Sequence, residues 1–242
     1  MKKITVVTIC YNAEKCIKET IQSVLGQSYT DFEYLIIDGK SKDNTIEIIK
    51  EFEDERIIFV SEKDNGIYDA MNKGIRLSSG EYIIFMNSGD VFADSKVLED
   101  ISSELKADVV FGNALIKKQE GIVREKYSDK KFRLFIMFLS GYMINHQTIF
   151  TKTELIKKYM FDLSYKICAD RALYAKLLKN KISFKRIDRD IVKYDGIEGI
   201  SSKRENLKNM ILENDRVIKE NFRFAYLITN PLKQIVRFFR HL

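Results

Sequence analysis

Polar residues that could bind a ligand follow the apolar runs of this 242-residue chain. Asp38 ends the run 32–37, Asp64 follows the run 57–60, and Asp90 comes after the run 82–86. Asn12 follows the first run, at 4–9. Such residues are common in turns, so one loop alone is weak evidence for a site. Ligands of open α/β sheets bind outside the carboxyl ends of the strands, and four loops that converge there predict one binding site.

The side chains at these positions suit a nucleotide that carries a diphosphate. Asp38 can accept hydrogen bonds from a ribose or a base edge, and Lys73 can face a phosphate. Asp90 supplies the hard oxygen that Mg²⁺ or Mn²⁺ prefers. The sequence has neither a Walker-type phosphate loop nor a G-x-G-x-x-G motif after the first run. The diphosphate is therefore expected to be held by a metal ion and side chains.

A sheet with helices between its strands must position these loops. The short apolar runs alternate with helical patterns at 17–25, 44–52 and 68–77, where Asn44 suits a helix cap and Gly26 a helix end. This alternation predicts a parallel, doubly wound α/β sheet. After Asp90 the pattern is looser: it predicts helices at 97–105, 168–178 and 202–222, and strands at 108–112, 147–150 and 191–194, and it is ambiguous at 123–127.

Composition and charge restrict the class of protein. The hydrophobic content of 45% allows a substantial core. Residues 201–242 hold nine Lys/Arg and four Asp/Glu, an excess of five within a net charge of +6. No nucleic-acid recognition motif accompanies this charge, which disfavours a nucleic-acid partner. The three cysteines have no metal or redox spacing, and the start lacks a signal peptide, which predicts a cytoplasmic protein. No apolar run reaches about 20 residues, so no membrane span is expected.

Four motifs in succession carry a resemblance to a known family. The segments 8–12 (TICYN), 36–45 (IIDGKSKDNT), 62–74 (EKDNGIYDAMNKG) and 80–90 (GEYIIFMNSGD) resemble family 2 glycosyltransferases of the GT-A fold, of the colanic-acid and O-antigen type. The resemblance covers residues 4 to about 200. It implies a nucleotide-sugar-binding half at 1–112, an acceptor half at 113–200, and a C-terminal helical segment at 201–242.

The resemblance also implies roles for individual residues. The nucleoside would be held by Thr8, Tyr11, Asn12, Asp38 and Ser41, and the donor site would be lined by Asp64, Gly66, Asp69 and Lys73. The turn Asn87-Ser88-Gly89-Asp90 corresponds to the metal motif usually written D-x-D. Asn87 and Gly89 stand where the family often has carboxylates, so Asp90 is left as the metal ligand, with the substrate's phosphates completing the coordination.

A base for the acceptor hydroxyl is expected at the start of the helix 168–178. An Asp there can simply favour the positive end of the helix. The family, however, has its base in a short acidic motif at this place, which implies that Asp170 is the base, and Ala169 replaces the usual preceding Glu. His146 and Gln147 resemble the family's His-Gln pair and are expected to contact donor phosphate or acceptor. The loop 193–201 resembles a glycine-and-serine loop that is either a lid or a plain connection.

Two apolar segments have more than one interpretation. The segment 132–139 is too short to span a membrane, and it is either a core helix or an acceptor-facing or interfacial patch. In the tail, Leu232, Ile235, Val236 and Phe239 share one helical face, and Lys233, Arg237 and Arg240 share another. This basic amphipathic pattern suits an anionic bilayer surface or docking on the protein's own core.

These observations predict an inverting, metal-dependent glycosyltransferase. It would move a sugar from a nucleotide-diphospho-sugar, most expectedly a UDP-sugar, to a lipid-linked saccharide. The enzyme would be attached peripherally to the inner face of the cell membrane. One alternative is a non-catalytic protein that binds saccharide or nucleotide. Another is a sugar nucleotidyltransferase, which would need a Gly-rich loop with Arg and Lys after the first strand, and residues 10–14 lack it.

Overall fold

A computed structural model of the chain describes residues 3–128, 130–140, 142–180, 182–196 and 206–227. Nine strands of this part form one sheet in the order β3-β2-β1-β4-β8-β6-β9-β5, with β7 paired to β6. The strands are β1 (Ile4–Cys10), β2 (Phe32–Asp38), β3 (Ile57–Ser61), β4 (Tyr82–Phe85), β5 (Val91–Phe92), β6 (Val109–Lys118), β7 (Gly121–Glu125), β8 (Ile149–Lys152) and β9 (Phe184–Asp195).

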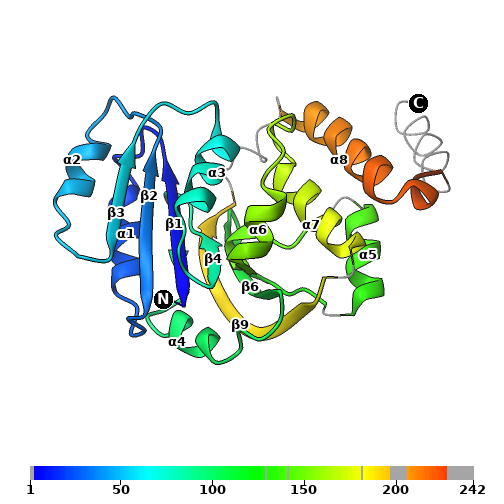
Figure 1. The fold of residues 1–242 in the computed structure, drawn as a ribbon, viewed down its shortest axis with the longest axis horizontal. Coiled ribbons are helices and arrows are strands. Elements are labelled where there is room, and N and C mark those ends of the chain that lie inside the picture. Colours follow the sequence, from blue (N-terminus) through cyan, green and yellow to red (C-terminus); the bar gives the residue numbers. More distant parts are fainter. Residues whose placement is uncertain (1–2, 129, 141, 181, 197–205, 228–242) are drawn as a thin grey trace.

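The first four long strands form the parallel part that the sequence predicts. β1 pairs in parallel with β2 on one side and β4 on the other, and β2 pairs in parallel with β3. Every residue of β1, β2 and β4 is buried, which is typical of parallel strands covered on both faces. The carboxyl ends of these strands point upward in Figure 1, because the N-terminus lies at the lower end of β1.

The second half of the sheet is mixed, and the looser sequence pattern after Asp90 predicted no strand direction there. β8 runs antiparallel to β4 and to β6, β6 runs parallel to β9, and β5 runs antiparallel to β9. β8 begins directly after a 3₁₀ turn, η1 (His146–Thr148), that lies against β4. Since the chain enters β8 beside the carboxyl end of β4, it must run back along that strand. β6 runs through the expected 112/113 boundary, and its pairing with β9 shifts register there.

Helices cover both faces of the sheet and bury two cores (Figure 1). The helices are α1 (Ile17–Leu25), α2 (Thr45–Lys50), α3 (Ile67–Leu77), α4 (Val97–Ser102), α5 (Lys131–Ser140), α6 (Thr153–Tyr159), α7 (Ala169–Lys179) and α8 (Leu207–Asn221). Alternate residues of β1 divide between the cores: Val7 packs with Met71 of α3 and Leu173 of α7, and Val6 packs with Ile21 of α1 and Leu98 of α4. The period-two pattern of the strands therefore separates the layer that carries Asp170 from the layer of α1.

The helix ends differ in detail from the sequence prediction. Asn44 is the residue before α2, as expected, but its side chain makes no capping hydrogen bond. Its amide instead donates to Glu14 Oε2 at 3.0 Å. Asn44 thus joins the loop after β1 to the loop after β2, and both loops belong to the predicted nucleoside side.

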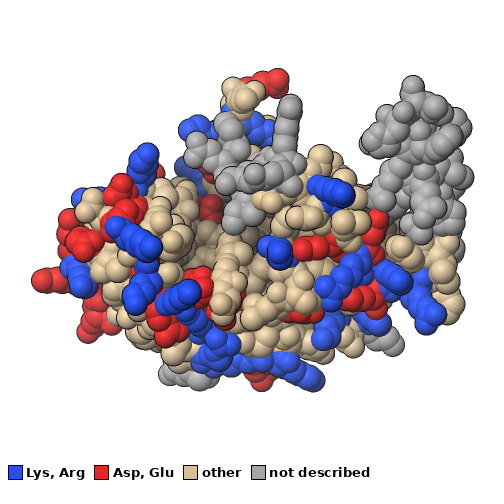
Figure 2. Space-filling view, turned by 90° about the horizontal axis from the view of Figure 1, so that it is seen from above, with Lys and Arg blue, Asp and Glu red and all other residues tan. Residues whose placement is uncertain are grey.

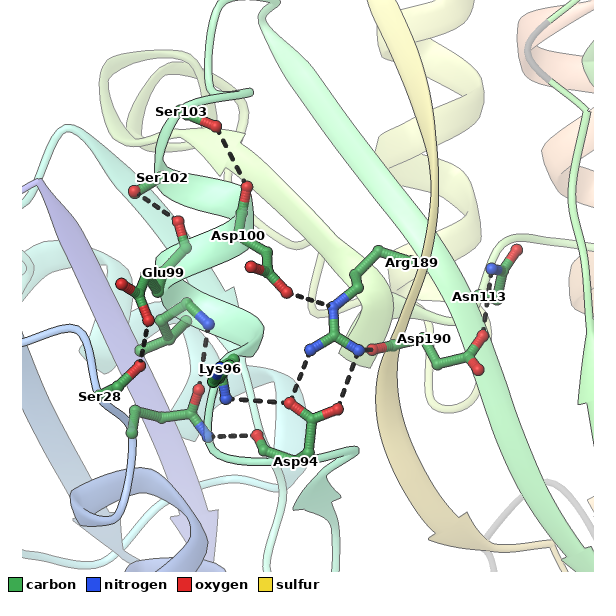
Figure 3. Close-up of polar contacts among 12 residues, drawn as sticks. Ser28, Asp94, Lys96, Glu99, Asp100, Ser102, Ser103, Asn113, Arg189 and Asp190 are labelled. Carbon is green, nitrogen blue, oxygen red and sulfur yellow. Dashed lines mark hydrogen bonds and ion pairs between the residues drawn. The ribbon is translucent and has the colours of Figure 1, made fainter.

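An arginine of β9 fastens this strand to the segment after β5 (Figure 3). Arg189 Nη2 donates to Asp94 Oδ1 at 2.6 Å, and Nε donates to Asp100 Oδ2 at 2.8 Å. Close by, Asn113 on β6 donates to Asp190 on β9. Neighbouring residues of β9 are thus bonded to different elements, Arg189 to the segment after β5 and to α4, and Asp190 to β6.

The segment 132–139 is helical, and one of its faces is buried in the core while the other is exposed. In α5, Leu134 and Phe138 are buried, and Phe132 and Ile136 are exposed. α5 contacts the end of α8 through an edge-to-face pair of Phe135 and Phe222, with ring centroids 5.1 Å apart. Over the described ranges, we find no helix with the length and apolar content needed to cross a bilayer. The amphipathic pattern at 228–242 and most of the loop 193–201 lie outside the described residues.

Candidate active site

Asp90 ends a tight turn that follows β4 directly. Gly89 has a φ of +95°, which residues with a side chain rarely adopt, and its N–H donates to Thr20 Oγ1 on α1 at 2.9 Å. The N–H of Asn87 donates to Asp90 Oδ2 at 3.1 Å, so the turn closes on the carboxylate. The turn therefore holds Asp90 at the carboxyl end of β4, as its small polar residues predict.

The environment of Asp90 disfavours its charged form. Only 7% of this residue is exposed. Burial raises the pKa of Asp90 to about 6, although the nearby His146 and hydrogen bonds from Gln147 and the Asn87 N–H oppose the shift. The charged form of such a poorly hydrated carboxylate is stabilised by a cation or a hydrogen-bond donor that approaches it.

The imidazole of His146 joins the Asp90 turn to α7. Its Nε2 lies 2.9 Å from Asn87 Nδ2, and its Nδ1 lies 3.2 Å from Asp170 Oδ2. His146 and Gln147 form η1 before β8, and Gln147 is hydrogen-bonded to Asp90. The structure thus brings together the predicted metal ligand, the predicted His-Gln pair and the predicted base.

Asp170 lies in the first turn of α7 and reaches the surface with 16% of its side chain. Its Oδ1 accepts from the Arg171 N–H at 2.7 Å and is 3.3 Å from the Tyr68 hydroxyl. The Tyr68 hydroxyl also donates to the Ile167 carbonyl at 2.5 Å. A partly exposed carboxylate with fixed neighbours, beside the positive end of a helix, is suited to accept a proton from a bound hydroxyl group.

The loop before Asp170 is held by a residue that the sequence does not single out. Glu213 on α8 accepts the backbone N–H groups of Lys166, Ile167 and Cys168 at 2.8 to 2.9 Å. Tyr68, on α3, is likewise unassigned by the sequence reasoning, although it stands inside the third motif. Both contacts join segments far apart in the chain, and no local pattern could have indicated them.

A second cluster lies at the ends of β1 and β2. Asp38 is fully buried and accepts hydrogen bonds from the hydroxyl groups of Ser41 and Ser61. Ser41 Oγ also accepts the Asn12 N–H at 2.8 Å, and Asn12 has a φ of +50°, which Asn tolerates better than most residues. Tyr11 is 58% exposed beside them. This cluster offers an aromatic face and an ordered loop pair for a nucleoside.

Thr8 differs from these neighbours because it is completely buried. Its hydroxyl group is 2.9 Å from the Tyr34 hydroxyl. The structure therefore places Thr8 within the sheet rather than on its rim, and a role in nucleoside binding stays a prediction.

The expected donor-site residues of α3 and the loop before it are occupied by local contacts. Asp64 Oδ1 accepts the Gly66 N–H at 3.0 Å, and Asp69 Oδ2 accepts the Asn65 N–H at 2.9 Å. A side chain at Gly39 would come within 2.5 Å of Asp64 Oδ2, so the loops after β2 and β3 touch each other.

Lys73 is held by the chain rather than extended into solvent. Its Nζ donates to the Lys63 carbonyl at 2.7 Å and lies 3.1 Å from Glu62 Oε1. The view onto the carboxyl ends of the strands has acidic and basic side chains interspersed (Figure 2). A phosphate contact by Lys73 would require it to leave these partners, and that contact stays a prediction.

The residues of the Asp90 turn fit a divalent cation that the substrate helps to hold. Within the part of the chain that the structure describes, no three His, Cys, Asp or Glu residues cluster as a metal site. Asp90 supplies one carboxylate, and Asn87 Oδ1 is a buried oxygen without a hydrogen-bond partner. Mg²⁺ is commonly held by one or two carboxylates and by substrate phosphates. The two oxygens of this turn suit an ion that binds together with the substrate better than an ion that the protein alone would hold.

The comparisons with known proteins assign the family. The model of glycosyl transferase family 2 matches residues 5–178. The chain therefore belongs to this family, as its four motifs predict, and is a glycosyltransferase of the GT-A fold.

Two named relatives match this chain in sequence. An Escherichia coli protein named UDP-Glc:alpha-D-GlcNAc-diphosphoundecaprenol beta-1,3-glucosyltransferase WfgD is 32% identical over 184 residues, which are 74% of this chain and 72% of that protein. A poly-beta-1,6-N-acetyl-D-glucosamine synthase of Staphylococcus epidermidis is 34% identical over 119 residues, 47% of this chain and 29% of that protein.

Solved structures match the fold at low sequence identity. Residues 1–349 of Staphylococcus aureus TarS, in complex with UDP-GlcNAc, match with a TM-score of 0.73 at 20% identity, over 91% of this chain and 67% of that one. The mannosyltransferase PcManGT of Pyrobaculum calidifontis, in complex with GDP-Man and Mn²⁺, matches with a TM-score of 0.68 at 13% identity, over 91% of this chain and 64% of that one. The chain thus spans about two thirds of the length of these structures.

Proposed function

We propose that this protein transfers a sugar from a UDP-sugar to a lipid-linked saccharide in the synthesis of a bacterial surface polysaccharide, with inversion at the anomeric carbon. The observation that carries the proposal is the line from Asp90 through Asn87 and His146 to Asp170. It puts a donor-side carboxylate and a candidate base on two sides of one histidine. The name of WfgD, with its UDP-Glc and diphosphoundecaprenol, supports the choice of donor and acceptor.

In this proposal Asp170 is the base. The acceptor hydroxyl group loses its proton to the carboxylate as its oxygen attacks the anomeric carbon, a step for which a positioned base typically contributes ~10²–10⁴-fold. Asp38 and Tyr11 hold the nucleoside and so orient the anomeric carbon toward that oxygen. One base and one displacement lead to inversion, by analogy with the inverting geometry of glycoside hydrolysis.

Asp90 would hold Mg²⁺ or Mn²⁺ together with the donor's phosphates. When bound, the ion supplies positive charge that stabilises the leaving diphosphate. Asp90 itself orients toward the donor because Gln147 and the Asn87 N–H hold its carboxylate.

A lipid-linked acceptor places the reaction at the inner, cytoplasmic face of the cell membrane. Exposed apolar side chains support peripheral attachment there: Phe132 and Ile136 on α5 are 74% and 46% exposed, and Phe224 and Leu227 after α8 are 85% and 61% exposed. The Phe135–Phe222 contact joins these two groups. Such residues suit the boundary between head groups and acyl chains.

The test is a transfer assay with the purified chain, a panel of UDP- and GDP-sugars, and a synthetic lipid-diphosphate-linked sugar, with and without Mn²⁺. Metal-dependent transfer from a UDP-sugar is expected, and the NMR coupling constant of the new anomeric proton should report inversion. Metal-linked binding of UDP-sugars without transfer to any acceptor would instead favour a non-catalytic binding protein. Formation of a UDP-sugar from UTP and a sugar 1-phosphate would favour a nucleotidyltransferase.

A further inference from the structure

We propose that Asn87 is a positioning residue that fixes the tautomer of His146, so that His146 Nδ1–H donates to the base Asp170. The inference rests on the proposed function and deepens it. At this position the family's metal motif often has a carboxylate. Asn87 is assigned a different role from that carboxylate.

The proton positions follow from the chemistry of the partners. An ionised carboxylate only accepts hydrogen bonds, so the 3.2 Å contact with Asp170 Oδ2 requires a proton on His146 Nδ1. The other nitrogen of a neutral imidazole is then an acceptor. Asn87 Nδ2, 2.9 Å from Nε2, is a donor that satisfies it. If the amide were reversed, an oxygen would face Nε2, and the ring would have to carry both protons.

Asn87 and the histidine itself are both held by the surrounding structure. Asn87 lies two residues after the buried end of β4, and its N–H is bonded to Asp90. His146 belongs to η1, which contacts β4, β6 and β9. The ring is therefore oriented by elements on two sides, and its Nδ1 has one direction in which to donate.

This orientation selects one oxygen of Asp170 for the reaction. A carboxylate oxygen offers about two lone-pair directions. Oδ1 accepts the Arg171 N–H at 2.7 Å and has the Tyr68 hydroxyl oxygen beside it at 3.3 Å, a group that donates its one proton to the Ile167 carbonyl. Among the described residues, Oδ2 accepts a hydrogen bond from His146 alone, which leaves one of its lone pairs open. The acceptor's proton is therefore expected to go to Oδ2.

An aspartate at position 87 could not do the same. Its carboxylate would accept from Nε2, and the proton would move to that nitrogen. A neutral ring would then present a lone pair to Asp170, and a doubly protonated ring would place a positive charge beside it that opposes proton uptake. In both cases the base would work less well, even though the turn would have gained a carboxylate for a metal ion.

The first experiment measures the tautomer directly, without metal, nucleotide or acceptor. The chain has two histidines, so His241→Gln leaves the ¹⁵N ring signals of His146 alone in the NMR spectrum. We expect a proton on Nδ1 in this protein, and a shift of the proton toward Nε2 in Asn87→Asp. A proton on Nε2 with an unprotonated Nδ1, or an Asn87→Asp spectrum like that of the parent, would overturn the inference. Because activity is not needed, this result is independent of whether the proposed function holds.

The second experiment compares Asn87→Asp with Asn87→Ala in the transfer assay at saturating Mn²⁺. We expect kcat to fall about tenfold or more in both, with KM for the UDP-sugar within about threefold of the parent value and unchanged circular dichroism. Gln119→Glu, which alters an exposed amide in the turn between β6 and β7, controls for the added charge. If Asn87→Asp keeps full kcat and only Asn87→Ala loses it, position 87 serves the metal ion through an oxygen, and the inference is wrong.

Discussion

Arg171 donates from its guanidinium to the backbone carbonyl of Phe138, which joins α7 to α5. Its Nη1 donates to Asn214 Oδ1 on α8, and only 3% of the residue is exposed. Burial lowers the pKa of this arginine, although Cys168 and Asp170 oppose the shift. One buried side chain thus fastens three helices beside the proposed base.

Arg171→Ala should destabilise the fold without removing a group that touches substrate. The change leaves the Phe138 carbonyl and the Asn214 side chain without their donor, which costs about 1–3 kcal/mol of unfolding free energy for each group. Urea unfolding followed by circular dichroism measures it, with the exposed Arg76→Ala as control. Arg171→Lys should be intermediate, because one ammonium group cannot reach both partners. A loss below about 0.5 kcal/mol in Arg171→Ala would contradict this role.

Asp170→Asn should lower kcat by about 10²–10⁴-fold, because an amide cannot accept the hydroxyl proton. The amide oxygen can still accept one of the two hydrogen bonds that Asp170 accepts, from the Arg171 N–H or from His146, and the side chain keeps its size, so the fold should be kept. Affinity for UDP, measured by calorimetry, should stay within about threefold. A variant that retains more than a third of the parent kcat would rule out Asp170 as the base.

Asp90→Asn should abolish metal-dependent transfer and, at the same time, stabilise the free protein at neutral pH. The pKa of Asp90 is raised to about 6 by burial, above the ~3.9 of an unfolded aspartate. Folding therefore takes up a proton between these values, and the stability of the parent falls as pH rises from about 4 to about 6. The asparagine removes this loss, so a gain on the order of 1–3 kcal/mol is expected at pH 8 and little difference near pH 4.

Urea unfolding at the two pH values measures this difference, with the exposed Asp31→Asn as the matched control. An equal effect of Asp90→Asn at both pH values would show that the burial of charge is not the cause.

Glu33→Gln should lower the stability at neutral pH, far from the proposed site. Burial raises the pKa of Glu33. Hydrogen bonds from Ser79, Thr5 and the Gly80 N–H lower this pKa by more than burial raises it, so the net shift is downward. A lowered pKa in the folded state contributes stability that is present above the ~4.3 of an unfolded glutamate and is lost as pH falls toward the folded pKa.

The glutamine should therefore cost about 1–3 kcal/mol at pH 7 and progressively less as the pH falls below about 4. Thermal or urea unfolding over this pH range measures the difference, with the exposed Glu53→Gln as the control. A deficit that stays constant with pH would mean that shape and not charge is responsible.

Phe132→Asp and Phe224→Asp should reduce binding to vesicles that contain anionic lipid, since each replaces an exposed aromatic side chain of the proposed membrane-facing group by a charge. Co-sedimentation with liposomes measures the bound fraction. Ile122→Asp on β7 changes a side chain that is 66% exposed and should have no effect. Equal losses in all three variants, or in none, would contradict attachment through α5 and the segment after α8.

Much of the first half of the fold could be predicted from local signals. The β-branched runs at 4–9, 32–37 and 82–86 become β1, β2 and β4, and the apolar spacing of Ile17 and Ile21 becomes the buried face of α1. Strand direction in the second half could not be predicted in the same way, because β8 follows a 3₁₀ turn instead of a crossover helix.

The candidate site shows the same division. The type and position of Asp90 and Asp170 were available from motifs, because Asp90 follows a recognisable strand and Asp170 lies at the start of a recognisable helix. Tyr68 and Glu213 were not, because their roles depend on contacts 102 and 45–47 residues along the chain.

By itself the sequence determined which residues carry oxygen ligands and carboxylates, and that the strands before them would be buried, since side-chain chemistry and hydrophobic period are properties of short segments. Only the tertiary structure decided that His146 lies between Asn87 and Asp170. A hydrogen bond depends on distances of a few tenths of an ångström between groups on different elements, and those distances exist only after β4, η1 and α7 have packed together.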